Sequence, residues 1–280
     1  MRSGNGNTRS DMPNRRPLRM TRGALPVVLL ASLTAGCGTG GKVSLDSRFV
    51  GEQRADKGIV VILPGIEGES AANHNIRQGL ADGGIPYALA IYRWGYPVPG
   101  IGMWVNQTNA DANRKAGRGL AEAIAKYQQK RPGRPVFLIG HSGGGGVAIF
   151  ALEALAGIPG ARPIEGAFLF HASISADYPL STALRMTRRG IANAYNPEDI
   201  AMLSTGTGMF GNVDGKKGPT AGLHGFAGRY PRLYQKPVTA SDAGVVSSPH
   251  FVMTQARLIS ERAPDWILSE SWPPPRYRSR

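Results

Sequence analysis

Short unbroken apolar runs alternate along this chain with longer stretches of helical periodicity. The runs span four to eight residues, and several are rich in valine and isoleucine. A run of this kind is typical of a strand that is buried on both faces, as in a parallel sheet. Such runs predict strands at residues 58–63, 85–92, 135–139 and 166–170, and residues 191–195 and 236–239 are two further strand candidates.

The stretches between these runs favour helices. From Thr108 to Lys130, for example, apolar side chains recur every four residues, and Pro132 ends the pattern. Similar reasoning predicts helices at 71–81, 108–130, 143–156, 180–188 and 251–261. Strands that alternate with helices need crossover connections. The predicted fold class is therefore α/β, a mostly parallel sheet flanked by helices on both faces.

The first 36 residues have the pattern of an export signal. Residues 24–35 are apolar and uncharged, and arginines precede them. This apolar core is too short for a bilayer span, which needs about 20 residues, but it suits a signal peptide. Met1, Met12 and Met20 are all candidate start sites.

Cys37 is the only cysteine, so a disulfide scaffold is excluded. Small residues, Ala35 and Gly36, precede it, and glycines follow it. This arrangement resembles the lipobox of bacterial lipoproteins. The resemblance implies cleavage before Cys37, lipidation of its thiol, and a membrane-anchored lipoprotein of the bacterial cell envelope.

The composition is that of a globular protein, with 41% hydrophobic and 19% charged residues. The net charge of +14 is unevenly spread, because residues 1–23 carry six arginines and one acid. The other basic residues are dispersed and form no recognised nucleic-acid module, so a nucleic-acid partner is not expected. Attraction to anionic lipid or polysaccharide explains the charge equally well. No metal-ligand spacing occurs, and neither a metal nor a cofactor is expected.

The segment Gly140-His141-Ser142-Gly143-Gly144 matches G-x-S-x-G. A predicted buried strand runs into it and an apolar helix leaves it. A sharp strand-to-helix turn exposes a serine hydroxyl for attack, and it needs small residues on both sides. The start of the following helix directs free N–H groups at a developing oxyanion.

With this context the chain resembles the α/β-hydrolases, over residues 58–268. The resemblance implies a serine hydrolase that cleaves carboxylic esters, with Ser142 as nucleophile. It also implies an oxyanion hole made by the backbone N–H groups of Ile66, after the first strong strand, and of Gly143. The substrate is expected to be a small-molecule or lipid ester, and the oligomeric state stays open.

The family order is serine, acid, histidine. His250 follows the last predicted strand and is the favoured base, with His224 as the alternative. His171, next to a predicted strand, is interpreted as a core or rim residue. Asp199 follows the strand at 191–195 and is the favoured acid, with Asp177 as the alternative.

The expected organisation is a signal peptide at 1–36, a lipidated cysteine with a tether or N-terminal segment at 37–57, the hydrolase domain at 58–268, and an extended basic proline-rich tail at 269–280. A non-catalytic envelope lipoprotein that uses the same fold as a binding module is the alternative function, because fold does not imply function.

Overall fold

The computed structural model describes residue 1 and residues 42–43, 46–96, 101–201 and 211–277. Residues 2–36 of the predicted signal peptide and the predicted lipidation site Cys37 lie outside these residues. No helix within the described ranges is long and apolar enough to cross a membrane.

The described chain forms one seven-stranded sheet of order β1-β3-β2-β4-β5-β6-β7. Strands β2 to β7 are parallel, and only the short β1 pairs in the antiparallel sense with β3. The strands are β1 Lys42–Val43, β2 Ile59–Leu63, β3 Ala88–Arg93, β4 Val136–His141, β5 Ile164–Phe170, β6 Thr187–Tyr195 and β7 Leu233–Pro237.

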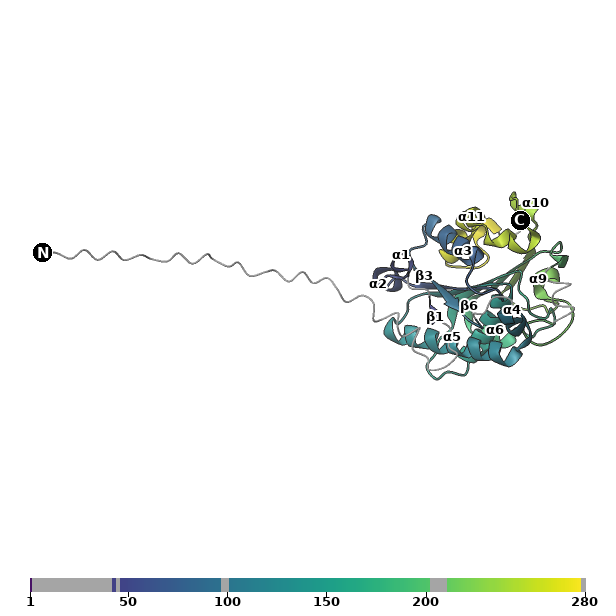
Figure 1. The fold of residues 1–280 in the computed structure, drawn as a ribbon, viewed down its shortest axis with the longest axis horizontal. Helices are drawn as coiled ribbons and strands as arrows, with labels where there is room; N and C mark the ends of the chain where they lie inside the picture. Colours follow the sequence, from purple (N-terminus) through teal and green to yellow (C-terminus); the bar gives the residue numbers. More distant parts are fainter. Residues whose placement is uncertain (2–41, 44–45, 97–100, 202–210, 278–280) are drawn as a thin grey trace.

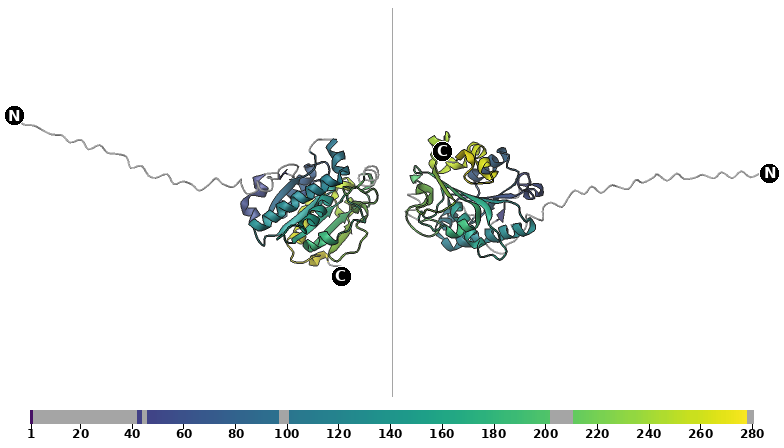
Figure 2. Two further views of the ribbon diagram at one scale, coloured as in Figure 1. Left: turned by 90° about the horizontal axis from the view of Figure 1, so that it is seen from below. Right: turned by 180° about the vertical axis from the view of Figure 1, so that it is seen from behind.

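Helices cover both faces of this sheet (Figure 1). Helices α3 and α11 pack together on one face, and α5 and α6 pack together on the other. The two views of Figure 2 show the same layers from other directions. The helices are α1 Ser47–Val50, α2 Glu52–Ala55, α3 Ala71–Asp82, α4 Ile101–Thr108, α5 Ala110–Lys130, α6 Gly143–Leu155, α7 Ser181–Arg185, α9 Ala221–His224, α10 Ala240–Ala243 and α11 Ala256–Ile267, with 3-10 turns η3 Pro249–Thr254 and η4 Pro275–Tyr277.

The predicted fold class is confirmed. Strands β2, β3 and β4 are buried almost throughout, as their unbroken apolar runs predict. The last predicted helix differs, because Pro249 starts a separate 3-10 turn and α11 begins only after the extended Gln255. Strand β6 begins at Thr187, so the helix expected over 180–188 shortens to α7.

The packed unit extends beyond residues 58–268 at both ends. Phe49 and Val50 of α1, in the N-terminal segment before residue 58, are buried. The tail expected to be extended also packs back as far as Tyr277. Trp272 is buried against Phe168, with ring centroids 4.8 Å apart. Aromatic burial outweighs the proline-rich character of this segment.

Helices α3 and α11 approach each other closely at Gly79. A Cβ atom there would lie 2.4 Å from the backbone oxygen of Ala256. Gly→Ala inside a helix normally stabilises by about 0.5–1 kcal/mol. Here we expect Gly79→Ala to lower the free energy of unfolding by about 1–2 kcal/mol, because overpacking costs about 1–3 kcal/mol. Urea denaturation measures this change.

Gly157 is the matched control, because a Cβ atom there would meet its nearest neighbour at an ordinary 3.6 Å. Gly157→Ala should leave the urea concentration at the midpoint of unfolding almost unchanged. A Gly79→Ala variant as stable as the wild type would contradict the close approach of the two helices.

Candidate active site

Ser142 lies in a strained turn between β4 and α6. Its backbone has φ 51° and ψ −124°, a conformation that residues with a side chain seldom adopt. The turn needs the flanking glycines. A Cβ atom at Gly140 would lie 2.5 Å from the oxygen of Gly144, and one at Gly144 would lie 2.3 Å from the oxygen of Leu63. Strand, sharp serine turn and helix thus occur in the order that the motif predicts.

The register of the sheet brings the ends of β4, β5 and β6 level. His141 pairs with Phe170, and Phe170 pairs with Ala194. Ser142 donates its backbone N–H to the oxygen of Phe170 at 2.9 Å. The carboxyl edge of these three strands therefore carries Ser142 and His171 side by side, with the loop that holds Asp199 after β6.

The two proposed oxyanion donors lie next to each other. A Cβ atom at Gly143 would be 2.7 Å from Cγ2 of Ile66. Helix α6 begins at Gly143, so the N–H of this residue has no carbonyl one turn back to bind. This N–H is available to an oxygen atom of a bound substrate, and it sits at the positive end of the helix dipole.

Buried side chains hold the loop after β2 in place. Trp94 donates its indole N–H to the oxygen of Pro64 at 2.8 Å. Asn106 donates its side-chain amide to the oxygen of Ile66 at 3.0 Å and accepts the N–H of Tyr96 at 2.7 Å. Sequence reasoning missed Asn106, because a single asparagine in α4 carries no periodic signal.

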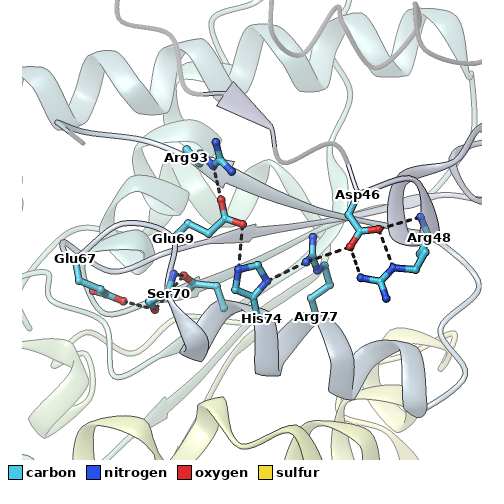
Figure 3. Close-up of polar contacts among 9 residues, drawn as sticks. Asp46, Arg48, Glu67, Glu69, Ser70, His74, Arg77 and Arg93 are labelled. Atoms are coloured by element: carbon cyan, nitrogen blue, oxygen red, sulfur yellow. Dashed lines mark hydrogen bonds and ion pairs between the residues drawn. The ribbon is translucent and has the colours of Figure 1, made fainter. Parts of the chain in front are cut away.

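A chain of polar contacts continues from this loop along α3 (Figure 3). Glu69 pairs with Arg93 of β3 and lies 3.3 Å from His74. The hydroxyl of Ser70 donates to Glu67 at 3.3 Å. Burial raises the pKa of the Glu67 carboxyl. The network ties the loop that carries Ile66 to β3 and to the first turns of α3.

Asp199 and His250 form a close buried pair. Nδ1 of His250 lies 2.5 Å from Oδ2 of Asp199, and both side chains are almost fully buried. Burial alone would raise the pKa of Asp199, but the imidazoles of His171 and His250 outweigh it, so the net pKa is lowered. An ionised carboxylate only accepts, so Nδ1 of His250 donates. Nε2 of neutral His250 is then unprotonated, as a general base requires.

Asn196 connects the loop that carries Asp199 with the turn that carries His250. Its side-chain amide donates to the oxygen of Pro249 at 3.0 Å, and its side-chain oxygen accepts the N–H of Glu198 at 3.0 Å. Asn196 is fully buried. This residue was not predicted, although an asparagine before a proline is a recognised turn signal.

Two further histidines surround this pair. Nε2 of His141 donates to the backbone oxygen of His250 at 3.0 Å, since a carbonyl can only accept. Nδ1 of His171 lies 3.5 Å from Oδ2 of Asp199, and its backbone has φ 52°. Burial lowers the pKa of both imidazoles, and both side chains are fully buried. His171 is therefore buried, as expected, but it borders the acid of the site.

The alternatives Asp177 and His224 do not join this cluster. The side chain of Asp177 is 72% exposed and lies 3.6 Å from Nζ of Lys216. His224 is exposed at the end of α9. Among the sequence-based candidates within the described ranges, only Asp199 and His250 form an acid–base pair with each other.

His171, Asp199 and His250 have the ligand types of a zinc site, with ligand atoms within 4.8 Å of one another. Tetrahedral zinc at about 2.0–2.1 Å from its ligands would separate those atoms by about 3.3 Å. The 2.5 Å between Asp199 and His250 is shorter. That distance suits a direct hydrogen bond from Nδ1 of His250 to the carboxylate better than a bridging ion.

No protein-family model and no curated protein matches this sequence. Several solved structures resemble the fold. A lipase-esterase related protein from Clostridium acetobutylicum is 9% identical, with 81% of this chain and 99% of that chain covered and a TM-score of 0.46. The propeptide form of the Bacillus licheniformis lipase BlEst2 is 15% identical, with 84% and 55% covered and a TM-score of 0.47. Likeness at this level establishes no activity, so function has to be argued from the residues of this chain.

The two buried histidines make stability depend on pH. Their pKa is lowered in the folded chain and returns to about 6.5 on unfolding. The unfolded state therefore binds more protons as the pH falls below about 6.5, and stability falls with it. We expect the free energy of unfolding to fall by up to about 1.4 kcal/mol per pH unit for each histidine. Urea titrations at pH 7.5, 6.5 and 5.5 measure the slope.

His141→Gln should remove the contribution of His141 to the fall of the unfolding free energy with pH. Glutamine does not titrate, and its side-chain amide can still donate to the oxygen of His250. His224→Gln is the matched control and should not change the slope, since His224 is exposed. Identical slopes for the wild type and His141→Gln would show that buried His141 does not control the acid sensitivity.

Proposed function

We propose that this protein is a serine hydrolase that cleaves carboxylic esters through Ser142, His250 and Asp199. The observation that carries the proposal is the strained turn of Ser142 at the carboxyl edge of the sheet, where the buried pair of His250 and Asp199 also lies. The imidazole of His141, adjacent to Ser142, lies with its ring centroid 4.9 Å from that of His250. Nucleophile, base and orienting acid are the parts that acyl transfer through a serine requires.

In the proposed reaction the Ser142 hydroxyl attacks the ester carbonyl while Nε2 of His250 takes its proton. Asp199 holds Nδ1–H and stabilises the imidazolium that forms. The N–H groups of Ile66 and Gly143 hold the oxyanion, and in a well-studied protease the loss of one such donor costs about 3–4 kcal/mol. His250 then protonates the leaving alcohol, and water hydrolyses the acyl-enzyme by the reverse transfer.

The same proposal includes a lipid anchor. Cys37 would carry the lipid, and the mature chain would sit at a membrane of the bacterial cell envelope. The support is the order of residues 1–41 in the sequence: arginines, apolar core, small residues, cysteine and glycines. The substrate would then be an ester that reaches this surface, from either a small molecule or a lipid.

We expect Ser142→Ala to abolish hydrolysis of p-nitrophenyl esters and labelling by a fluorophosphonate. His250→Ala should cost about as much, because members of a nucleophile–base unit are not additive. Asp199→Asn should cost less than either, since serine and histidine remain in place with a less well-oriented imidazole. Initial rates on esters of increasing chain length give the ranking and the preferred acyl length.

Ser181→Ala, at the exposed start of α7, and His224→Ala are the matched controls and should keep near-normal rates. Folding of each variant is checked by circular dichroism. A folded wild type that neither reacts with the fluorophosphonate nor hydrolyses any ester would favour the non-catalytic binding module.

For the anchor, we expect Cys37→Ala to abolish incorporation of a fatty-acid probe and to release the protein from the membrane fraction, because no other thiol is present. Cell fractionation and metabolic labelling measure this directly. A wild type that takes up no lipid probe would disprove lipidation without affecting the proposed hydrolase chemistry.

A further inference from the structure

A hollow of about 400 Å³ lies between the sheet and α11. Its floor is β6, on which Ala192 and Ala194 are only partly buried although they lie in the middle of a sheet. Large side chains stand beside these alanines on both neighbouring strands. The register gives two cross-strand rows, Phe168–Ala192–Tyr234 and Phe170–Ala194–Lys236.

The short side chains of the two alanines therefore leave a trough between the larger side chains of β5 and β7. Neighbouring strands lie about 4.8 Å apart, so a trough whose walls stand on the strands either side of β6 is wide enough for one alkyl chain. Leu258, Ile259 and Trp266 of α11 cover it, and Met253 lies among its lining residues. Most of the residues that line the hollow are therefore apolar. Its volume lies within the range of about 300–1,000 Å³ typical of ligand sites.

Basic residues stand where this hollow continues outward. A second hollow of about 490 Å³ shares Lys236, Arg262 and Tyr277 with the first. Within the described part of the chain, the side chains of Lys236 and Arg262 make no ion pair.

Two acidic residues near this opening make contacts of their own. The carboxylate of Asp242 caps α10 through Thr239, at 2.9 Å from its hydroxyl. Hydrogen bonds from Thr239 lower the pKa of Asp242, and the charges of Lys236 and Arg262 contribute less. Asp265 pairs with Arg276 at 3.1 Å. Three basic residues, Lys236, Arg262 and Arg276, and one acid, Asp242, line the second hollow, so the charge at this opening is net positive.

We propose that this hollow binds a single-chain amphiphile with a carboxylate head, a long-chain fatty-acid anion. The alkyl chain lies along Ala192 and Ala194 beneath α11, and the carboxylate lies between Lys236 and Arg262. An apolar interior with a cationic opening matches this ligand and disfavours a neutral or cationic amphiphile. Ser142 does not line the hollow, so the proposal goes beyond ester hydrolysis and is independent of it.

The test uses 12-bromododecanoate, whose bromine quenches nearby tryptophan fluorescence. The purified full chain, produced without lipid attachment, should show saturable quenching that dodecanoate reverses. Trp266→Phe should remove most of the quenching while dodecanoate still binds by calorimetry. Dodecanol should bind about tenfold more weakly, and dodecyltrimethylammonium should not compete, because surface charge contacts contribute up to about fivefold each.

Variants locate the ligand. Lys236→Gln and Arg262→Gln should each weaken dodecanoate binding about two- to fivefold. Arg257→Gln is the matched control on α11, exposed and already paired with Glu261 at 2.8 Å, and should bind as the wild type does. Ala194→Leu should fill the trough and weaken binding at least about tenfold. Because the first two changes are at the opening, they test the site even if Ala194→Leu fails to fold.

Non-saturable quenching, equal affinity for all three amphiphiles, or identical binding by Arg257→Gln and Arg262→Gln would overturn the proposal. Fluorophosphonate labelling of the same samples keeps the two proposals apart. A chain that reacts with the fluorophosphonate but does not bind dodecanoate lacks the ligand site only. A chain that binds dodecanoate without reacting lacks the activity only.

Discussion

The close approach of the start of α6 to the sheet is the constraint on which the site depends. Four consecutive glycines, residues 143–146, open this helix. A Cβ atom on Gly145 would meet Cβ of Ala172 at 2.6 Å, and one on Gly146 would meet Cγ2 of Val213 at 2.2 Å. A side chain at either position would push the start of the helix away from Ala172 and Val213, and one at Gly144 would meet the backbone oxygen of Pro64 at 2.3 Å. Ser142 and the N–H of Gly143 would then lose their positions relative to Ile66.

This arrangement costs stability that the rest of α6 recovers. Each glycine inside a helix costs about 1 kcal/mol relative to alanine. From Val147 to Leu152 every residue of the helix is buried, in contact with the sheet and with α5. Fully burying a large apolar side chain contributes about 1.5–3 kcal/mol. The apolar half of the helix thus holds the glycine half in a conformation that it would not adopt alone.

The fold could be predicted, and the candidate site residues proposed, because both follow from short-range patterns. Buried strands are unbroken apolar runs, and the G-x-S-x-G spacing marks the turn. The order serine, acid, histidine then favoured Asp199 and His250. In the structure Nδ1 of His250 lies 2.5 Å from Oδ2 of Asp199. Asn106 and Asn196 escaped notice, because their partners lie 40 and 53 residues away and depend on loop conformation. The packing of Trp272 was not predicted either, because the prolines that follow it indicate an extended tail.

Strand β6 shows how two requirements can share one element. Its carboxyl end must be rigid, because Asp199 follows it and Asn196 fixes the acid loop to the turn of His250. Its middle carries only small side chains on the α11 face, so little side-chain packing holds it there. Backbone pairing with both β5 and β7 supplies the missing order, since a strand inside a parallel sheet is bonded along both edges. A hollow can therefore lie against β6 without loosening the acid at its end.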